Sequence, residues 1–290
     1  MRRTGLLILA VGAVVAAAIG GDEGAALAAV SRSSVAIDSA PAPALTRVDL
    51  VVIGDSLIGL SGTKCQAECL GFVQEYTYFL RDAFGVDTYS YAKAPAPGVP
   101  DAVQLVTEDD EWRQTVADAE VVVVETGFNN ALPDPATGIG CGGSFSIDWI
   151  LSTQPECLEQ GVATYGELYD QVFAGINELR AGQPTVLIVT TTINGNIDAS
   201  IRDGLLALAG DRADEVKAWA VAAYDRWNAM LTERAEAAGF VVVDLYHAFN
   251  GPDGSQPPGV LWGDGTYPSP AGYDLITAML ADVDLSVLGG

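Results

Sequence analysis

The sequence predicts a three-layer α/β/α sandwich around a five-stranded parallel sheet, flavodoxin-like in its general plan. Short apolar runs typical of strands alternate along the chain with segments of helical pattern, which is the order that gives a parallel sheet between two helical layers. The run VVVVE is apolar without alternation, as expected of a strand covered on both faces. The five predicted strands lie at residues 48–53, 86–91, 121–125, 185–191 and 240–246.

Helical segments fill the spaces between these runs. In the first of them, Val73, Tyr76 and Leu80 recur at helical spacing, and Gly85 is suited to end the helix. Helices are predicted over 68–85, after Pro100, over 165–180, around 215–238 and over 272–280.

The N-terminus has the pattern of an export signal. Arg2 and Arg3 precede an apolar stretch at 6–20, and small residues at 26–28 offer a cleavage site. We expect a secreted protein with no stable membrane span after cleavage, although an uncleaved anchor stays open. The predicted parts are a signal peptide at 1–28, a flexible linker rich in Ser, Ala and Pro at 29–46, and one domain at 47–290.

The chain is strongly acidic, with 38 Asp and Glu against 14 Lys and Arg and a formal net charge of −24 at pH 7. Its field would repel nucleic acid and anionic membrane surfaces, so we expect neither as a partner. The acids are scattered along the chain, which is typical of a solvated acidic surface. We expect the domain to be a monomer.

Four cysteines in an exported chain indicate disulfides. Cys65 and Cys69 are close enough in sequence to pair, which leaves Cys141 and Cys157, although four cysteines allow three connectivities. Neither pair has the two-residue spacing usual for zinc, and the only histidine is far away in the sequence. We therefore expect no metal.

Small and polar residues follow three of the predicted strands. Gly-Asp-Ser-Leu at 54–57 closes the first run, Gly98 follows the second, and Gly127 and Asn129 follow the third. The carboxyl ends of parallel strands share one edge of the sheet, where α/β proteins form their sites. A Ser N–H at a helix start and an Asn amide could stabilise an oxyanion there. Each motif can also be read as an ordinary cap or turn.

The turn after the first run speaks against two other kinds of site. It lacks Gly-x-Gly-x-x-Gly, which argues against a flavodoxin-like cofactor binder. Ile58 occupies the last position of Gly-x-Ser-x-Gly, which argues against the nucleophile elbow of larger α/β-hydrolases. We expect no cofactor.

With a C-terminal block, Asp-x-x-Tyr-Pro-Ser-x-x-Gly-Tyr at 264–273, these motifs resemble the GDSL/SGNH hydrolase family. The blocks occur in the family's order from residue 47 to the end. The resemblance implies an α/β/α fold and a serine hydrolase acting on carboxylic esters, such as acyl esters, lipids or acetylated glycans. It implies Ser56 as nucleophile, Asp264 as orienting acid, and an oxyanion hole from the N–H groups of Ser56 and Gly98 with the amide of Asn129.

The sequence departs from the family at the base. Tyr267 stands at the histidine position, and tyrosine, with an ordinary pKa of about 10, is a poor proton acceptor at neutral pH. We expect impaired turnover, or else a pseudoenzyme that binds an ester, glycan or protein partner. His247, after the last run, is either a relocated base or a solvated or capping residue. Asn130 replaces the family's usual Asp, a milder departure at a supporting position.

The connection over 131–161 is long for an α/β link, and a Cys141–Cys157 bridge would staple it. Because it follows the Asn129 motif, we expect it to overhang the site. Its apolar side chains form either a wall against the substrate or a small satellite core. They are Phe145, Ile147, Trp149 and Ile150.

Overall fold

The structure is a computed structural model, and its described part belongs to one unit of the chain. The chain divides into Met1–Pro41 and Ala42–Gly290, and every described residue lies in the second unit. The signal peptide and nearly all of the linker lie outside the described residues, so these boundaries remain predictions. The described residues are 45–59, 70–94, 98–127, 130–131, 146–152, 155–197, 205–261, 263 and 267–289.

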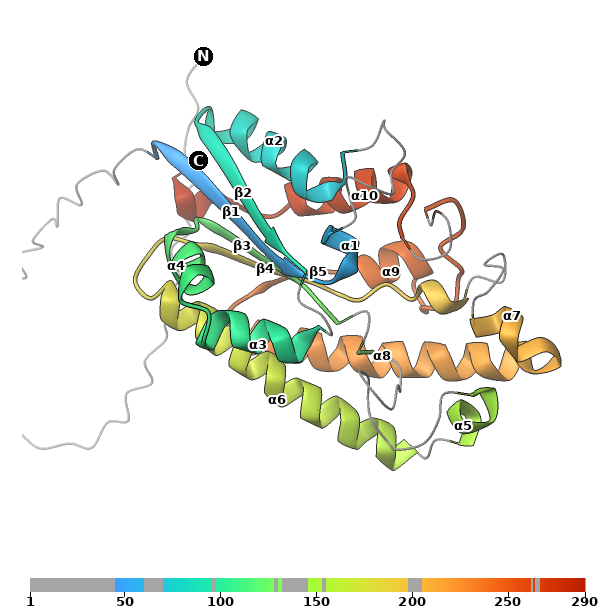
Figure 1. Ribbon diagram of the computed structural model, residues 1–290. Helices are drawn as coiled ribbons and strands as arrows, with labels where there is room; N and C mark the ends of the chain where they lie inside the picture. Colours follow the sequence, from blue (N-terminus) through green and yellow to red (C-terminus); the bar gives the residue numbers. More distant parts are fainter. Residues whose placement is uncertain are drawn as a thin grey trace, which may run out of the picture. The chain divides into compact units, whose positions relative to one another are not determined.

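The sheet has five parallel strands in the order β2-β1-β3-β4-β5 (Figure 1). This confirms the predicted fold class. In the pairing of β1 with β3, Gly54 lies opposite Glu125, so the carboxyl ends of the two central strands are level. The strands are β1 (Arg47–Gly54), β2 (Asp87–Lys93), β3 (Val121–Glu125), β4 (Val186–Thr190) and β5 (Val241–Val243).

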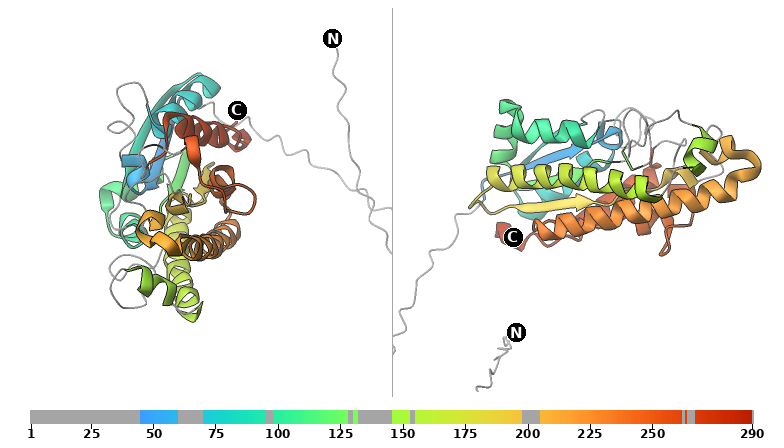
Figure 2. Two further views of the ribbon diagram at one scale, coloured as in Figure 1. Left: turned by 90° about the vertical axis from the view of Figure 1, so that its right-hand side faces the viewer. Right: turned by 90° about the horizontal axis from the view of Figure 1, so that it is seen from below.

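Helices cover both faces of the sheet as two separate layers (Figures 1 and 2). α3, α4, α6 and α8 pack on one face, and α1, α2, α9 and α10 pack on the other. The helices are α1 (Ser56–Gly59), α2 (Phe72–Phe84), α3 (Val99–Thr107), α4 (Asp110–Asp118), α5 (Ile147–Ser152), α6 (Pro155–Leu179), α7 (Leu205–Ala209), α8 (Ala213–Ala237), α9 (Leu245–Asn250) and α10 (Pro270–Ala281). Short 3₁₀ helices are η1 (Gly195–Ile197), η2 (Gly210–Arg212), η3 (Gly259–Leu261) and η4 (Ser286–Leu288).

The core is split by the central strands, whose successive side chains point to opposite faces. Val122 and Val124 join the cluster under α3, α6 and α8, while Val121 and Val123 join the cluster under α2 and α10. All four are fully buried. Burial of such a side chain contributes about 1.5–3 kcal/mol, so the all-valine strand is explained by packing on both faces.

α2 ends as predicted but begins later. Gly85 adopts the left-handed conformation with φ 67°, and its N–H donates to the carbonyl of Arg81. Val73, Tyr76 and Leu80 are buried against the sheet. Leu70, which the helical pattern placed in this helix, lies before Phe72 and is 43% exposed, so that assignment was wrong.

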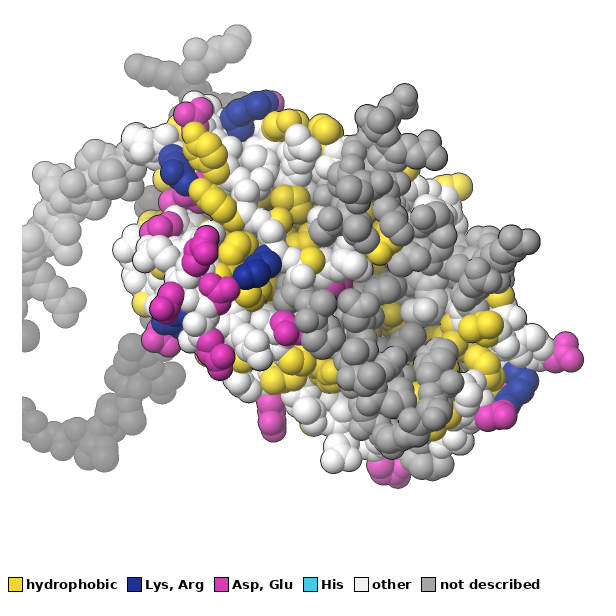
Figure 3. All heavy atoms as spheres, viewed as in Figure 1, with side chains coloured by type: hydrophobic (Ala, Val, Ile, Leu, Met, Phe, Trp, Pro, Cys, Tyr) yellow, Lys and Arg dark blue, Asp and Glu magenta, His cyan; other side chains and the backbone are white. Residues whose placement is uncertain are grey.

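β2 is an edge strand with an exposed face. Tyr89 and Tyr91 are exposed on it, and the guanidinium of Arg47 lies 4.6 Å from the Tyr89 ring centre and donates to the Tyr91 hydroxyl at 2.9 Å. Hydrophobic side chains and cations gather beside this edge in Figure 3. Charged residues at an edge strand discourage pairing with another chain.

The prediction of a long connection over 131–161 is wrong for the second half of that range. α5 starts at Ile147, and α6 starts at Pro155, ten residues before the predicted start at 165. A proline at the first helical position suits the fixed backbone angle and the unused N–H of that site.

α6 and α8 extend past the carboxyl edge of the sheet, and α5 and α7 lie at their far ends (Figures 1 and 2). A third apolar cluster forms there from α5, η1, α7 and the start of α8. Ile150 is buried in it, and Ile147 and Trp149 pack against it. For these three side chains the satellite-core interpretation is confirmed, whereas Phe145 lies outside the described residues.

β5 is shorter than predicted because its apolar run contains a helix start. The strand ends at Val243, and Asp244 caps α9 by accepting the N–H of His247 at 3.1 Å. The run 240–246 is therefore one short strand and the first turn of the next helix.

Only one of the four cysteines, Cys157, lies in the described part of the chain, and it is disulfide-bonded. Its partner is not described, so the pairings Cys65–Cys69 and Cys141–Cys157 stay predictions. Among the residues that the structure describes, none of the helices has the length and apolar character needed to cross a bilayer.

Candidate active site

Ser56 lies where β1 ends at the carboxyl edge of the sheet, as the first residue of α1. The turn before it is tied to the neighbouring strand, because the N–H of Asp55 donates to the carbonyl of Glu125 at 3.1 Å. The Asp55 carboxylate is buried and accepts the N–H of Leu57 at 3.0 Å. A Cβ at Gly54 would lie 2.7 Å from the Glu125 carbonyl, so this position requires glycine. Ser56 is therefore held on a fixed turn, partly exposed.

Gly98 lies at the start of α3, in the connection that follows β2. Its φ of 127° is in the region that favours glycine, and an added Cβ would lie 2.3 Å from Oδ1 of Asn130. Gly98 and Asn130 are thus in direct contact, although 31 residues separate the Val99 N–H from the Asn130 oxygen that accepts it. The structure brings the second and third motifs together.

Gly127 follows β3 with φ 125°. A Cβ there would lie 2.4 Å from the Tyr169 hydroxyl and 2.9 Å from the Trp227 ring. Tyr169 in turn donates to the carbonyl of Thr126. The chain can make this close approach to α6 and α8 only without a side chain. Asn129, the predicted amide donor, lies outside the described residues.

The C-terminal block packs against the start of α1. Ser269 caps α10 by accepting the Gly272 N–H at 3.2 Å, and the buried Tyr273 donates its hydroxyl to the carbonyl of Leu57 at 3.5 Å. The carbonyl of Tyr267 accepts the N–H of Gly263 at 2.7 Å. The block is therefore next to the turn that holds Ser56. Asp264 lies outside the described residues.

Gly272 is required for this packing, and we expect Gly272→Ala to destabilise the protein. An added Cβ would lie 2.2 Å from the carbonyl oxygen of Leu261, so the free energy of unfolding should fall by about 1–3 kcal/mol. Gly166→Ala, within α6, meets only ordinary contacts at 3.4 Å and should stabilise by about 0.5–1 kcal/mol. Urea unfolding of both variants checks this, and equal stabilities would contradict it.

Two carboxyl groups lie buried behind the Ser56 turn. Burial raises the pKa of Glu125 well above its ordinary value, and the negative charge of Asp55 raises it further. Oε2 of Glu125 has no hydrogen-bond partner among the described residues. Burial, and then the two carboxyl groups, also raise the pKa of Tyr169. The sequence did not predict this buried carboxyl pair. Its one signal was Glu125, an acid at the end of an all-valine strand.

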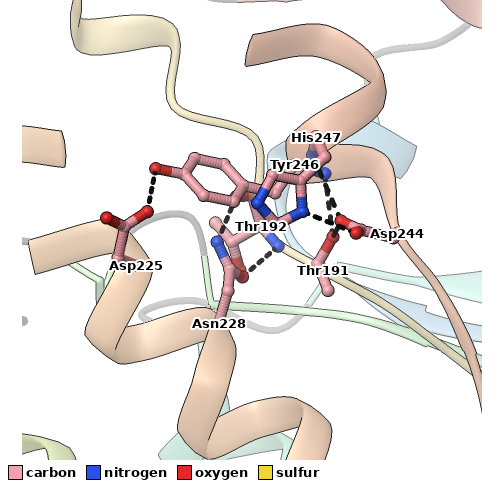
Figure 4. A network of polar contacts seen from close by, with 7 residues as sticks. All are labelled: Thr191, Thr192, Asp225, Asn228, Asp244, Tyr246 and His247. Atoms are coloured by element: carbon pink, nitrogen blue, oxygen red, sulfur yellow. Dashed lines mark hydrogen bonds and ion pairs between the residues drawn. The ribbon is translucent and has the colours of Figure 1, made fainter. Parts of the chain in front are cut away.

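His247 lies in a different polar network, at the start of α9 (Figure 4). Its Nδ1 is 2.6 Å from Oδ2 of Asp244, whose Oδ1 accepts the Thr191 hydroxyl at 3.1 Å. Beside it, the Tyr246 hydroxyl donates to Asp225 at 2.7 Å. The capping residue is Asp244, and the exposed His247 pairs with it from the first turn of α9.

This network lines a cavity of about 790 Å³ between α8 and the start of α9. Ser56, Gly98 and Tyr267 are not among its lining residues. The structure therefore does not bring His247 and Ser56 into one cavity, and a relocated base stays a prediction. Within the described ranges, no group of three or more His, Cys, Asp or Glu residues could hold a metal ion.

Comparisons with known proteins give a matching family model and similar solved structures. Residues 52–275 match the model of the GDSL-like Lipase/Acylhydrolase family. The lipase Lip_vut3 from a goat rumen metagenome is 18% identical with a TM-score of 0.54, covering 81% of this chain and 97% of that one. The acetylxylan esterase Axe2 from Geobacillus stearothermophilus is 17% identical with a TM-score of 0.49, covering 82% and 95%.

No curated protein matches the chain. At 18% identity the likeness to the goat rumen lipase shows the fold alone. The family model is the broader finding, because it runs from the end of β1 through the Ser56 turn and the Gly98 and Asn130 motifs into the first half of α10. On that match, the chain belongs to the GDSL-like lipase/acylhydrolase family.

Proposed function

We propose that the protein is an exported serine hydrolase of carboxylic esters, with turnover limited by Tyr267. The observation that carries the proposal is the Ser56 turn, which is held between the carboxyl ends of β1 and β3 and contacted by the C-terminal block. The family of lipases and acylhydrolases supplies the reaction class. Candidate substrates are acyl esters, lipids and acetylated glycans, bound by a secreted monomer.

In this proposal Ser56 attacks the ester carbonyl, and the oxyanion is stabilised by the N–H groups of Ser56 and Gly98 with the amide of Asn129. Asp264 orients the residue at position 267. A histidine there would take the serine proton and return it to the leaving alcohol. A neutral tyrosine hydroxyl can hydrogen-bond to the serine but accepts its proton poorly, which limits acylation.

Tyrosine at position 267 also favours a second candidate function, a pseudoenzyme that binds an ester, glycan or protein partner without turnover. Such a protein would keep the predicted pocket at Asn129 and Gly98. It would be indifferent to the hydroxyl of Ser56, whereas a hydrolase depends on it. The two candidates therefore differ in one measurable property.

The test is hydrolysis of p-nitrophenyl acetate by the secreted form and by Ser56→Ala. We expect slow turnover in the wild type and none above background in the variant, because without the nucleophile no acyl-enzyme forms. A rate that does not change in Ser56→Ala would reject the hydrolase and favour the binding protein. Thermal unfolding of both proteins controls for folding.

A further inference from the structure

Asn130 is a fully buried amide that joins three segments of the chain. Its Oδ1 accepts the N–H of Val99 at 3.0 Å, and its Nδ2 donates to the hydroxyl of Tyr165 at 3.4 Å. Its own N–H donates to the carbonyl of Gly127 at 2.9 Å. A single side chain therefore links the turn after β3, the first turn of α3 and helix α6.

The start of α3 depends on this contact. The first N–H groups of a helix have no partner within the helix, and Gly98, at the capping position, has no side chain to supply one. Asn130 provides the missing acceptor from another loop. It also lies against the Gly98 Cα, in the space that a Cβ would occupy. Asn130 thus holds the peptide between Gly98 and Val99 and lies against the Gly98 Cα.

We propose that Asn130 is a positioning residue for ester hydrolysis, which holds Gly98 in place so that the Gly98 N–H points at the developing oxyanion. The inference rests on the proposed function for the role of that N–H. Oxyanion donors act over a narrow range of distance, and a displacement of about 1 Å can lower a rate roughly a hundredfold. If Gly98 were held less firmly, stabilisation of the transition state would be weakened more than substrate binding.

Three variants separate the contacts of the amide. Asn130→Ala removes both the acceptor for Val99 and the donor to Tyr165. Asn130→Asp keeps an acceptor for Val99. Asn228→Ala is a matched control, because Asn228 is also buried and bridges backbone groups, accepting the Thr192 N–H at 2.7 Å and donating to its carbonyl at 3.0 Å.

The kinetic arm uses whichever protein shows Ser56-dependent turnover, the wild type or Tyr267→His. We expect Asn130→Ala to lower kcat about 10- to 100-fold with little change in KM, because the oxyanion is bound only in the transition state. Asn130→Asp and Asn228→Ala should stay within about threefold of the parent. A rise in KM without a fall in kcat would overturn the proposal.

The structural arm is amide hydrogen exchange over residues 98–106, read in the full-length protein. Asn130→Ala should speed exchange at Val99 at least about tenfold, because its N–H loses its partner, while Asn228→Ala should not. Unchanged exchange would overturn the positioning role whether or not the protein is active. Faster exchange in a protein with no Ser56-dependent turnover would support the positioning of Gly98 and reject the proposed function instead.

If Asn130→Ala does not fold, Tyr165→Phe takes its place in both arms. This variant removes only the hydroxyl that the Asn130 amide contacts. Smaller changes in the same direction, in exchange at Val99 and in kcat, are expected. Their absence in a folded Tyr165→Phe protein would contradict the proposal.

Discussion

Tyr267→His is expected to raise ester hydrolysis about a thousandfold over the wild type, because it supplies the proton acceptor that the proposed mechanism lacks. Two described parts of the proposed site are held near the serine. Ser56 is fixed on its turn, and the C-terminal block contacts α1 through the hydroxyl of Tyr273. General-base catalysis contributes roughly 10²–10⁴-fold when the geometry is correct.

The measurement is kcat/KM for p-nitrophenyl acetate between pH 5 and 9. The rate of Tyr267→His should rise with pH and level off above about pH 7, because a neutral imidazole is the active form. Adding Ser56→Ala should abolish the gain. Tyr89→His, on the exposed edge strand β2, is the matched control for imidazole catalysis that does not involve the site.

A wild type already as active as Tyr267→His would contradict this expectation and show that another base is present. His247 would then be the first residue to replace, by His247→Ala. Its pairing with Asp244 leaves Nε2 without a hydrogen bond in the described structure, so the ring has a free proton site. The separate cavity that it lines argues against this outcome.

The fold could be predicted because the strands are buried by simple patterns. VVVVE became β3 and the run that precedes Gly54 became β1, since a strand covered on both faces needs only apolar residues. The prediction failed where one side chain decides between strand and helix. Asp244 interrupts the last run by capping α9, and in the sequence it reads as a single polar residue among apolar ones.

The part of the candidate site that could be predicted is the set of motifs at the carboxyl edge of the sheet. Ser56, Gly98 and Gly127 all follow strands, and their position at one edge of the sheet follows from the parallel order. The contact between Asn130 and Val99 could not be foreseen, because it depends on how a loop after β3 reaches the start of α3. The raised pKa of Glu125 likewise depends on burial, which the sequence does not show.

The second large effect concerns Glu125, and we expect Glu125→Gln to stabilise the protein at neutral pH. Burial, together with Asp55, holds the pKa of the folded carboxyl well above its ordinary value, whereas in the unfolded chain it ionises near pH 4.5. Between these two values the folded protein binds one proton more than the unfolded chain. The stability from this group is complete below about pH 4.5 and is lost as the pH rises.

The difference in unfolding free energy between Glu125→Gln and wild type should therefore grow with pH above 4.5, by up to about 1.4 kcal/mol per pH unit. At pH 4 the two should be similar, because glutamine and a protonated carboxyl are both neutral and alike in shape. Urea unfolding from pH 4 to 8 gives this difference curve, and Glu178→Gln on the exposed face of α6 is the control for the substitution itself.

A flat difference curve would mean that Glu125 is ionised in the folded protein, with its charge stabilised by a group that the described contacts do not include. A rising curve would show that the carboxyl group of Glu125, which lies behind the Ser56 turn, is neutral in the folded protein. That matters for the chemistry, because a second full negative charge behind Ser56 would oppose the oxyanion that forms in front of it. A protonated Glu125 leaves Asp55 as the single buried charge at the turn, so the same burial that weakens the fold at high pH favours the proposed hydrolysis.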